Sequence, residues 1–400
     1  MKPRLFINIH YLEIGGAETS LIGLLQALDP MRVEVDLFLN DHRGEMKKYV
    51  PDWVNVLPEN KAYSMIEKPI RDVLKAGFLR IAIARLWAKI RFWFYARTKK
   101  PFDGSAIFGY VGHCVTPVLP SLNHLGEYDL AISFLAPHNI VRDKVRAKRK
   151  ICWIHTDYSR IAVNPALEEP VWQSFDRIVS ISRDVMDNFC RLFPSLRAKI
   201  LEMENILSPT FVRSRAAEGP RPADMPETGN VLSLLTIGRY SFPKRLEEIP
   251  TICRRLIENG LDIVWYVIGY GGSDEYIRKA IADTGMGDHV FLLGKRENPY
   301  PYIAACDWYV QPSRYEGKSV TVREAQILGK PVIITDYPTS SSQIQDGVDG
   351  VIVPMRCEEC ADAMAHVLTD EGLKKKIIEH LACHDFGNED EIHKIYSLVE

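Results

Sequence analysis

The sequence predicts an α/β protein of two Rossmann-like domains, each a doubly wound parallel sheet. Short, nearly continuous apolar runs alternate with helical patterns in two separate stretches of the chain, as strands buried on both faces of a sheet require. The 400 residues exceed what one hydrophobic core usually serves. With 46% hydrophobic and 26% charged residues, the composition is that of an ordinary globular chain.

The first domain is expected over residues 1–204. It opens with a strand, a Gly15-Gly16 turn and a helix that runs to about Leu28. Its strands are expected at Leu5–Ile9, Val33–Leu39, Tyr128–Ser133, Lys150–Ile154, Arg177–Ser180 and Lys199–Met203.

A linker is expected over residues 205–230, because this stretch holds four prolines and no sustained apolar period. The alternation then restarts in a second domain, residues 231–400. Helices are expected at Arg245–Asn259 and Tyr276–Ala282. The strands are expected at Val231–Ile237, Asp262–Ile268, Val290–Leu293, Trp308–Val310, Pro331–Ile334 and Gly350–Val353. Ligands of such sheets bind at the carboxyl ends of the strands, so functional motifs should follow strands directly.

The charge balance excludes one class of partner and suggests another. A net charge of −2 argues against a nucleic-acid-binding protein, which would carry a basic excess. Residues 61–100, however, carry +9, and the rest of the chain carries −11. Five large apolar residues of this basic segment fall on one helical stripe, which ends at Trp93, and Arg80, Arg85, Lys89 and Arg91 lie off it. We expect this segment to dock on an anionic membrane surface; the alternative is a packed helix with a basic exterior.

The expected location is cytoplasmic, with possible peripheral attachment to the cytoplasmic face of a membrane. The first residues do not form a secretory leader, and no apolar run reaches the length of a membrane span. The eight scattered cysteines are expected to be reduced.

Glycine-rich turns follow three predicted strands. Gly15-Gly16 opens a helix, whose N-terminus offers free N–H groups to an anion. Gly238-Arg239 ends a strand of the second domain, and Lys244 follows five residues after Arg239. A guanidinium and an ammonium so placed suit a pyrophosphate. The loop from Gly269 to Gly272 ends the next strand. Each of these turns taken singly could equally be ordinary turn chemistry.

The strongest motif runs from Glu316 to Glu324 and spans a loop and the start of a helix. Ser319 is a plausible N-cap, and Gly317 and Lys318 would present backbone N–H groups at the positive helix end. A carboxylate on the helix suits a ribose diol, and a carboxylate in the loop suits sugar hydroxyls. The alternative is a pair of solvated glutamates.

Taken together, these motifs closely resemble the family-4 retaining glycosyltransferases of the GT-B fold. The resemblance rests on Glu316-x7-Glu324 within Gln-Pro-Ser-Arg-Tyr-Glu-Gly, the following Gly329-Lys-Pro, and the Gly15-Gly16 and Gly238-Arg239…Lys244 motifs. The resemblance covers nearly the whole chain. Within the family, the sequence is similar to enzymes of bacterial surface-polysaccharide and glycolipid synthesis.

The resemblance implies a role for each motif residue. Arg239 and Lys244 would bind the donor diphosphate, and Gly16 and Gly238 would let backbone approach it. Glu324 would bind ribose, Glu316 the transferred sugar, and the amides of Gly317, Lys318 and Ser319 the sugar or phosphate. Gly294 and Arg296 would lie at the base. His155, at a strand end of the first domain, would contact the sugar or be a hydrogen-bonded structural residue.

The sequence departs from the family pattern at Lys318-Ser319, where many members have Phe-Gly, so the contacts of this loop with the sugar differ. No Asp-x-Asp pair follows a strand, and we expect neither a metal nor a cofactor. The predicted function is retaining, metal-independent transfer of a hexosyl or N-acetylhexosaminyl group. The donor would be a UDP-sugar and the acceptor a hydroxyl of a lipid-linked saccharide or glycolipid. Alternatives are a nucleotide-sugar epimerase or hydrolase, or a non-catalytic sugar-nucleotide-binding subunit.

Overall fold

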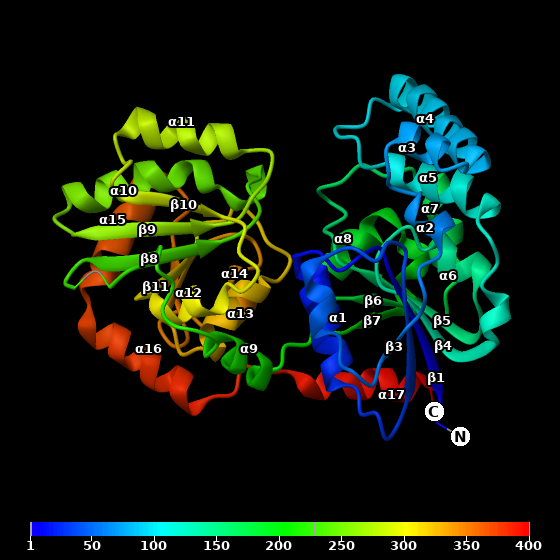
Figure 1. Cartoon of the computed structure of the whole chain (residues 1–400). Helices are drawn as coiled ribbons and strands as arrows, with labels where there is room; N and C mark the ends of the chain where they lie inside the picture. Colours follow the sequence, from blue (N-terminus) through cyan, green and yellow to red (C-terminus); the bar gives the residue numbers. More distant parts are fainter. Residues whose placement is uncertain (1, 228, 400) are drawn as a thin grey trace. The chain divides into compact units, whose positions relative to one another are not determined.

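A computed structural model describes residues 2–227 and 229–399, which form two compact units (Figure 1). The first unit comprises residues 1–206 and 388–400, and the second comprises residues 207–387. Each unit is a parallel sheet with helices on both faces, which places the central strands in an apolar interior.

The first unit holds a seven-stranded parallel sheet in the order β3-β2-β1-β4-β5-β6-β7. Its strands are β1 (Arg4–Ile9), β2 (Glu34–Leu39), β3 (Asn55–Val56), β4 (Glu127–Ser133), β5 (Arg146–Ile154), β6 (Arg177–Ser180) and β7 (Ile200–Glu202). Its helices are α1 (Gly16–Ala27), α2 (Lys61–Ser64), α3 (Ile70–Lys75), α4 (Leu79–Lys99), α5 (Ile107–Val115), α6 (Asn139–Lys144), α7 (Pro165–Gln173), α8 (Arg183–Leu192) and α17 (His393–Val399).

The second unit holds a six-stranded parallel sheet in the order β10-β9-β8-β11-β12-β13. Its strands are β8 (Leu232–Ile237), β9 (Ile263–Ile268), β10 (Val290–Gly294), β11 (Trp308–Gln311), β12 (Val332–Thr335) and β13 (Val351–Val353). Its helices are α9 (Pro209–Ala216), α10 (Ile249–Glu258), α11 (Asp274–Thr284), α12 (Tyr300–Ala305), α13 (Val320–Ile327), α14 (Ser340–Gln343), α15 (Cys357–Thr369) and α16 (Glu371–Cys383).

Alternate residues of the second sheet fill two apolar cores, one on each face. Trp265 and Trp308 pack under α10 and α15, while Tyr266 and Tyr309 point to the opposite core with α12 and α13. Figure 1 shows these two groups of helices on the two sides of the sheet. The period-2 alternation of a strand produces this division, and it explains why the strand sequences read as continuous apolar runs.

The predicted linker is different from what the sequence suggested. Residues 209–216 form helix α9, and the buried side chains of Val212 and Met225 join the core beside α12 and α13. The prolines at 209, 220, 222 and 226 therefore lie in a packed segment of the second unit. Pro209 occupies the first helical position, where its missing N–H costs nothing.

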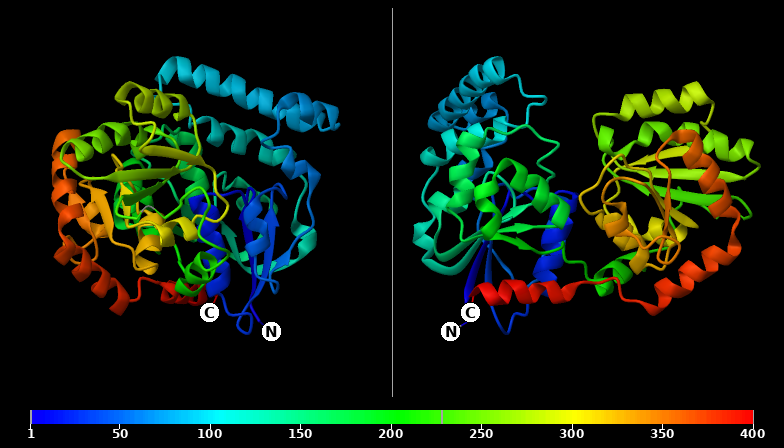
Figure 2. Two further views of the ribbon diagram at one scale, coloured as in Figure 1. Left: turned by 60° about the vertical axis from the view of Figure 1, so that its left-hand side comes forward. Right: turned by 180° about the vertical axis from the view of Figure 1, so that it is seen from behind.

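Two further boundaries differ from the expectation. The tail 388–400, assigned to the second domain from sequence, belongs to the first unit: Tyr396 is buried, and its hydroxyl accepts a hydrogen bond of 2.7 Å from the Asp29 amide. Figure 2 shows α17 beside the first sheet from two further sides. The helix expected from Arg245 begins only at Ile249, because Arg245 has a φ of 57° that interrupts the helical path.

Candidate active site

The candidate active site lies in the second unit, at the point where the strand order reverses. β8 pairs with β9 on one side and with β11 on the other, and the chain leaves β8 and β11 in opposite directions. Ligands of open α/β sheets bind outside the carboxyl ends of the strands at such a point. Gly238 and Arg239 follow β8, and the loop with Glu316 follows β11, so the two strongest motifs meet here.

The Glu316 carboxylate joins the two loops. Its Oε1 atom accepts hydrogen bonds from Lys244 Nζ at 2.6 Å, from Ser313 Oγ at 2.6 Å and from Gln311 Nε2 at 3.0 Å. The Glu316 side chain is only 11% exposed. Three donors on one oxygen fix the carboxylate without using its second oxygen, and they bring Lys244 to the carboxyl edge of the sheet as an oriented cation.

The glycine loops allow this close approach of backbone. A Cβ on Gly269 would lie 1.9 Å from the carbonyl oxygen of Gly238, so only glycine fits there. The side chain of Lys244 covers Gly238, whose hypothetical Cβ would lie 3.3 Å from Lys244 Cδ. The loops after β8 and β9 therefore pack backbone against backbone, as a surface for a large anion requires.

Arg239 completes the positive charge of this edge. Its side chain is exposed, and its guanidinium makes no hydrogen bond or ion pair with residues 2–227 or 229–399. Lys244, by contrast, is already paired with Glu316. The site thus offers Arg239 as a cation that a ligand can pair with, and Lys244 as a cation that Glu316 holds in position.

The start of α13 is less open than the sequence suggested. Ser319 occupies the N-cap position, as predicted, but its backbone N–H donates to Gln343 Oε1 at 2.6 Å. The Ser319 amide is therefore engaged within the unit and is not available to a ligand in this conformation. Thr339 Oγ1 donates to the carbonyl oxygen of Glu316 at 2.9 Å, which holds the loop that carries Gly317 and Lys318.

Glu324 is enclosed in the domain. It is 3% exposed, and its Oε1 atom accepts a hydrogen bond of 2.8 Å from the Tyr300 hydroxyl. Burial raises the pKa of Glu324 to about 7, because a carboxylate loses its hydration there.

Arg296 and Gly294 lie at the end of β10. Gly294 has a φ of 72°, in the region that favours glycine. Arg296 forms an ion pair with Asp224, and its Nε donates to the Tyr302 hydroxyl at 2.8 Å. The predicted base-contacting guanidinium is thus tied to the segment that the sequence analysis treated as linker.

In the first unit, Gly16 and His155 also follow strands. Gly16 is the first residue of α1, and a Cβ there would meet no heavy atom within 4 Å, so the protein itself does not require glycine at this position. The Nε2 atom of His155 is buried and has no hydrogen-bond partner among the described residues. Burial lowers the pKa of His155 to about 3; the ring is therefore neutral at physiological pH and offers one unpaired polar atom.

Sequence reasoning missed His10, which follows β1. Its Nδ1 contacts the Glu67 carboxylate and its Nε2 the carbonyl oxygen of Ala136. The strand order of the first sheet reverses between β1 and β4, and His10 bridges the loops after these two strands. The available signal was its place directly after the first predicted strand.

The four cations predicted to dock on a membrane all lie on α4, and they divide into two groups. Arg80 and Lys89 are exposed. Arg85 turns inward, where its Nη1 donates to the carbonyl oxygens of Met65, at 3.1 Å, and Lys68. Arg91 lies half-buried over the Tyr110 ring, 5.6 Å from its centroid. Arg85 and Arg91 therefore hold α4 in place, contrary to the expectation that they face a membrane.

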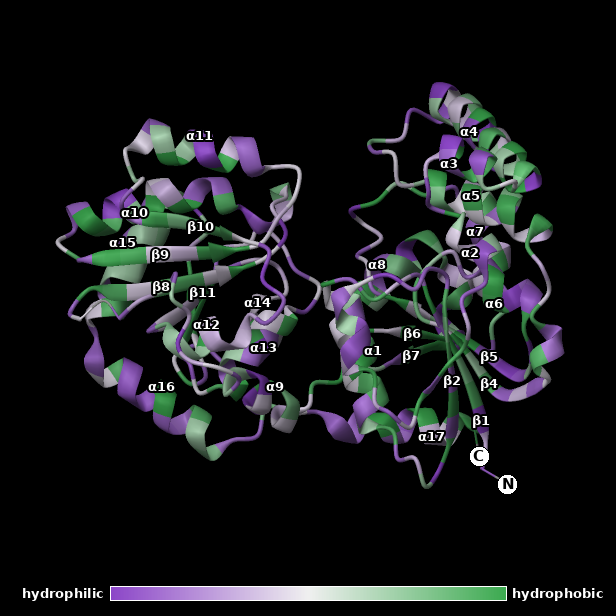
Figure 3. Ribbon diagram, viewed as in Figure 1, coloured by the Kyte–Doolittle hydropathy of each residue, from purple (hydrophilic) through white to green (hydrophobic). Residues whose placement is uncertain are grey.

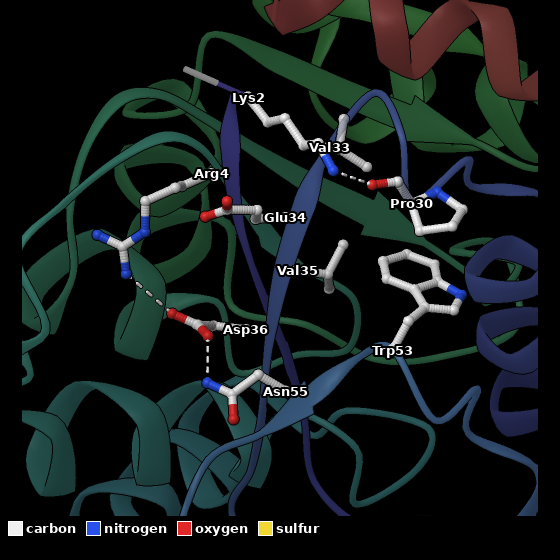
Figure 4. A pocket seen from close by; sticks show the side chains of 9 residues that line it. All are labelled: Lys2, Arg4, Pro30, Val33, Glu34, Val35, Asp36, Trp53 and Asn55. Carbon is white, nitrogen blue, oxygen red and sulfur yellow. Dashed lines mark hydrogen bonds and ion pairs between the residues drawn. The ribbon is translucent and has the colours of Figure 1, made fainter.

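A pocket of about 370 Å³ in the first unit is not part of this chemistry (Figure 4). It lies at the amino ends of β1 and β2, the edge opposite to the one that binds ligands in such sheets. In this pocket Asp36 accepts from Arg4 at 3.1 Å and from Asn55 at 2.6 Å.

Among residues 2–227 and 229–399, no group of three or more His, Cys, Asp and Glu side chains is placed to hold a metal ion. No helix there is both long enough and apolar enough to cross a membrane.

The second unit is similar to a known family. Residues 223–381 match the family described as "Glycosyl transferases group 1". Alpha-D-kanosaminyltransferase of Streptomyces kanamyceticus is 28% identical over 152 residues, which cover 37% of this chain and 39% of that protein. The amylovoran biosynthesis glycosyltransferase AmsK of Erwinia amylovora is 30% identical over 145 residues, 34% of this chain and 35% of that protein. The chain thus spans little more than a third of the length of these relatives.

Solved structures match over nearly the whole chain. The crystal structure of Anabaena Alr3699/HepE in complex with UDP and glucose superposes with a TM-score of 0.68 at 15% identity and covers 99% of this chain and 98% of that one. The crystal structure of TarM gives a TM-score of 0.65 at 12% identity, over 100% and 99%. The predicted fold class, two Rossmann-like parallel-sheet domains of the GT-B type, is confirmed, as is the resemblance to bacterial polysaccharide glycosyltransferases.

Proposed function

We propose that this protein, whose second unit contains a glycosyltransferase group 1 domain, moves a sugar from a nucleoside-diphosphate donor to an acceptor hydroxyl. The observation that carries the proposal is the Lys244–Glu316 pair at the switch point of the second sheet, 2.6 Å between Nζ and Oε1. It sets a cation for a diphosphate beside a fixed carboxylate for sugar hydroxyls. The exposed Arg239 adds the second charge that a departing nucleotide needs.

The donor we propose is a UDP-sugar, with a hexosyl or N-acetylhexosaminyl group. The crystallised neighbour HepE holds UDP and glucose, and the glycine-lined edge of the second unit suits a diphosphate. The acceptor we propose is a lipid-linked saccharide or glycolipid. Relatives named for amylovoran biosynthesis and for lipopolysaccharide core biosynthesis support this choice. We place the protein in the cytoplasm, at the inner face of a membrane.

The reaction proceeds with retention of configuration and without a metal in this proposal. The bond from the anomeric carbon to the diphosphate breaks, and its electrons leave with the nucleotide. The acceptor oxygen attacks from the same face and gives its proton to the departing phosphate. Arg239 and Lys244 stabilise the charge on that phosphate, and Glu316 orients the sugar. His155, neutral through burial, contributes a hydrogen bond to the sugar.

The test combines two site variants and a matched control. Lys244→Met and Glu316→Gln should each lower the rate of sugar transfer by about 10²- to 10³-fold. Lys279→Met should not, although Lys279 also pairs with a carboxylate, Asp283, at 2.5 Å, because it lies on the surface of α11. Thermal unfolding checks that all variants fold, and NMR of the product reports the anomeric configuration.

The alternatives predict different products from a panel of UDP- and GDP-sugars. An epimerase or hydrolase would alter or release the sugar with no acceptor present, and a non-catalytic subunit would bind the donor without turnover. Transfer at the wild-type rate by the Lys244 and Glu316 variants would refute the proposed site.

A further inference from the structure

Helix α4 of the first unit turns its largest apolar residues to the solvent. The outer face of α4, as we name it, consists of seven side chains that are each between 45% and 59% exposed. They are Leu79, Ile83, Leu86, Trp87, Ile90, Trp93 and Phe94. Successive members are separated by one, three or four residues, so they form a continuous stripe along the helix. A contiguous apolar stripe of this size marks an interaction surface on a soluble domain.

The orientation of α4 is set by its inner face. Ile81 and the three alanines Ala82, Ala84 and Ala88 are buried, and α4 packs on α3 and α5. Arg85 fixes the same rotation, because its guanidinium reaches the carbonyl oxygens of the segment before α3. Rotating the outer face inward would replace alanines by tryptophan and phenylalanine in a close-packed contact. The exposure of the outer face therefore belongs to the folded unit.

The charges on α4 itself are all positive. α4 contains six lysine and arginine residues and no acidic residue. The exposed Arg80 and Lys89 lie on opposite flanks of the stripe, and the Arg97 guanidinium covers the Trp93 ring at 4.6 Å from its centroid. Figure 3 shows hydrophobic and hydrophilic residues side by side along α4. The outer face therefore complements a partner that is apolar at its centre and anionic at its rim.

We infer that the outer face of α4 inserts into the interfacial region of an anionic lipid bilayer, with the helix axis along the membrane plane. At 1.5 Å per residue, the 21 residues of α4 span about 30 Å. Acyl chains then cover the apolar stripe, lipid phosphates meet Arg80 and Lys89, and the two tryptophans lie at the headgroup level. A second copy of this chain fits less well, because a symmetric contact would bring like charges together.

This inference concerns the partner of the proposed enzyme, and it rests on the proposed function only for the identity of the acceptor. Membrane binding by α4 itself needs neither donor nor acceptor. It keeps the expectation from sequence that this segment docks on an anionic membrane, but it excludes Arg85 and Arg91 from the lipid contact, because both are engaged by the protein.

The experiment is flotation of the full chain with vesicles of pure phosphatidylcholine and of phosphatidylcholine with 30 mol% phosphatidylglycerol. We expect binding to the anionic vesicles. Ile83→Ser/Ile90→Ser should lower the partition coefficient by at least about tenfold, since two exposed apolar side chains are lost. Met31→Ser is the matched control and should bind like the wild type, because Met31 is 75% exposed but lies between α1 and β2.

A second pair of variants tests the charges. Arg80→Gln/Lys89→Gln should lower binding to the anionic vesicles by about 25-fold, at about fivefold for each cation. Arg213→Gln/Lys376→Gln removes two exposed cations of the second unit and should leave binding unchanged. Circular dichroism confirms that each variant is folded.

Equal binding of the wild type and the Ile83/Ile90 variant, or no binding of the wild type, would overturn the inference. Sedimentation velocity covers the remaining outcome: self-association at micromolar concentration that the Ile83/Ile90 variant abolishes, without vesicle binding, would assign the face to a second copy. Calorimetry with UDP-glucose and no vesicles tests the donor site separately, so loss of donor binding would count against the proposed function alone.

Discussion

Replacing Glu324 by glutamine should remove a pH dependence from the stability of the second unit. Burial raises the pKa of Glu324 from its ordinary 4.5 to about 7, so the folded state holds a proton that the unfolded state releases between these values. The carboxyl therefore contributes its full stability below pH 4.5, and that contribution is lost as the pH rises to about 7. The difference between these two pKa values corresponds to about 3 kcal/mol of unfolding free energy.

Glutamine keeps the shape of the side chain and still accepts a hydrogen bond from Tyr300, but it does not titrate. The difference in unfolding free energy between the wild type and Glu324→Gln should therefore shift by about 3 kcal/mol against the wild type between pH 4.5 and pH 7.5. Urea dependence of hydrogen exchange in peptides from α13 measures this free energy for the second unit by itself.

A pH-independent difference would refute the reasoning, because it would mean that Glu324 ionises equally in both states. A difference that shifts in favour of the wild type as the pH rises would mean that a cation not seen in the structure stabilises the carboxylate. Binding of UDP-glucose at pH 8 should reduce the effect if the ribose contacts the charged form of Glu324.

The first unit should respond to pH with the opposite sign. Burial lowers the pKa of His138 and of His155 to about 3. Each histidine should therefore lower the unfolding free energy of the first unit by about 1.4 kcal/mol per pH unit as the pH falls below 6.5. His155→Gln should halve the slope measured in peptides of β5, and an unchanged slope would contradict this. Gly269→Ala should destabilise the second unit by at least about 2 kcal/mol, because its Cβ would meet a carbonyl oxygen at 1.9 Å. Gly272→Ala, which meets no atom within 4 Å, should cost less than about 0.5 kcal/mol in the same thermal unfolding experiment.

Most strand positions were predictable from the sequence, because a strand buried on both faces is an apolar run. The short β3 was not predicted, and neither was the polar start of β5, residues 146–149. β1, β8 and β9 lie within one residue of their expected bounds. The fold of segment 205–230 was not predictable from the sequence. Its prolines hide a short helix, and the core contacts of this segment are made with α12 and α13, nearly a hundred positions further along the chain. Periodicity within a window cannot register such partners.

The candidate site shows the same division. Spacing after strands identified Arg239, Lys244 and Glu316, because topology alone brings the carboxyl ends of neighbouring parallel strands together. It did not predict that Ser313 and Gln311 of the same motif hold Glu316, or that Gln343 engages the Ser319 amide. Those contacts depend on side-chain directions that the strand pattern does not encode.

By itself, the sequence determined the two parallel sheets, the order of the motifs after the strands, and the concentration of positive charge in residues 61–100. Only the tertiary structure decided which residues of that segment face solvent. A stripe of large apolar residues ordinarily turns inward, and here the buried alanines of α4 and the inward guanidinium of Arg85 occupy that side instead. The elements that pack against a helix determine which of its faces is buried, and the sequence of the helix alone does not specify those elements.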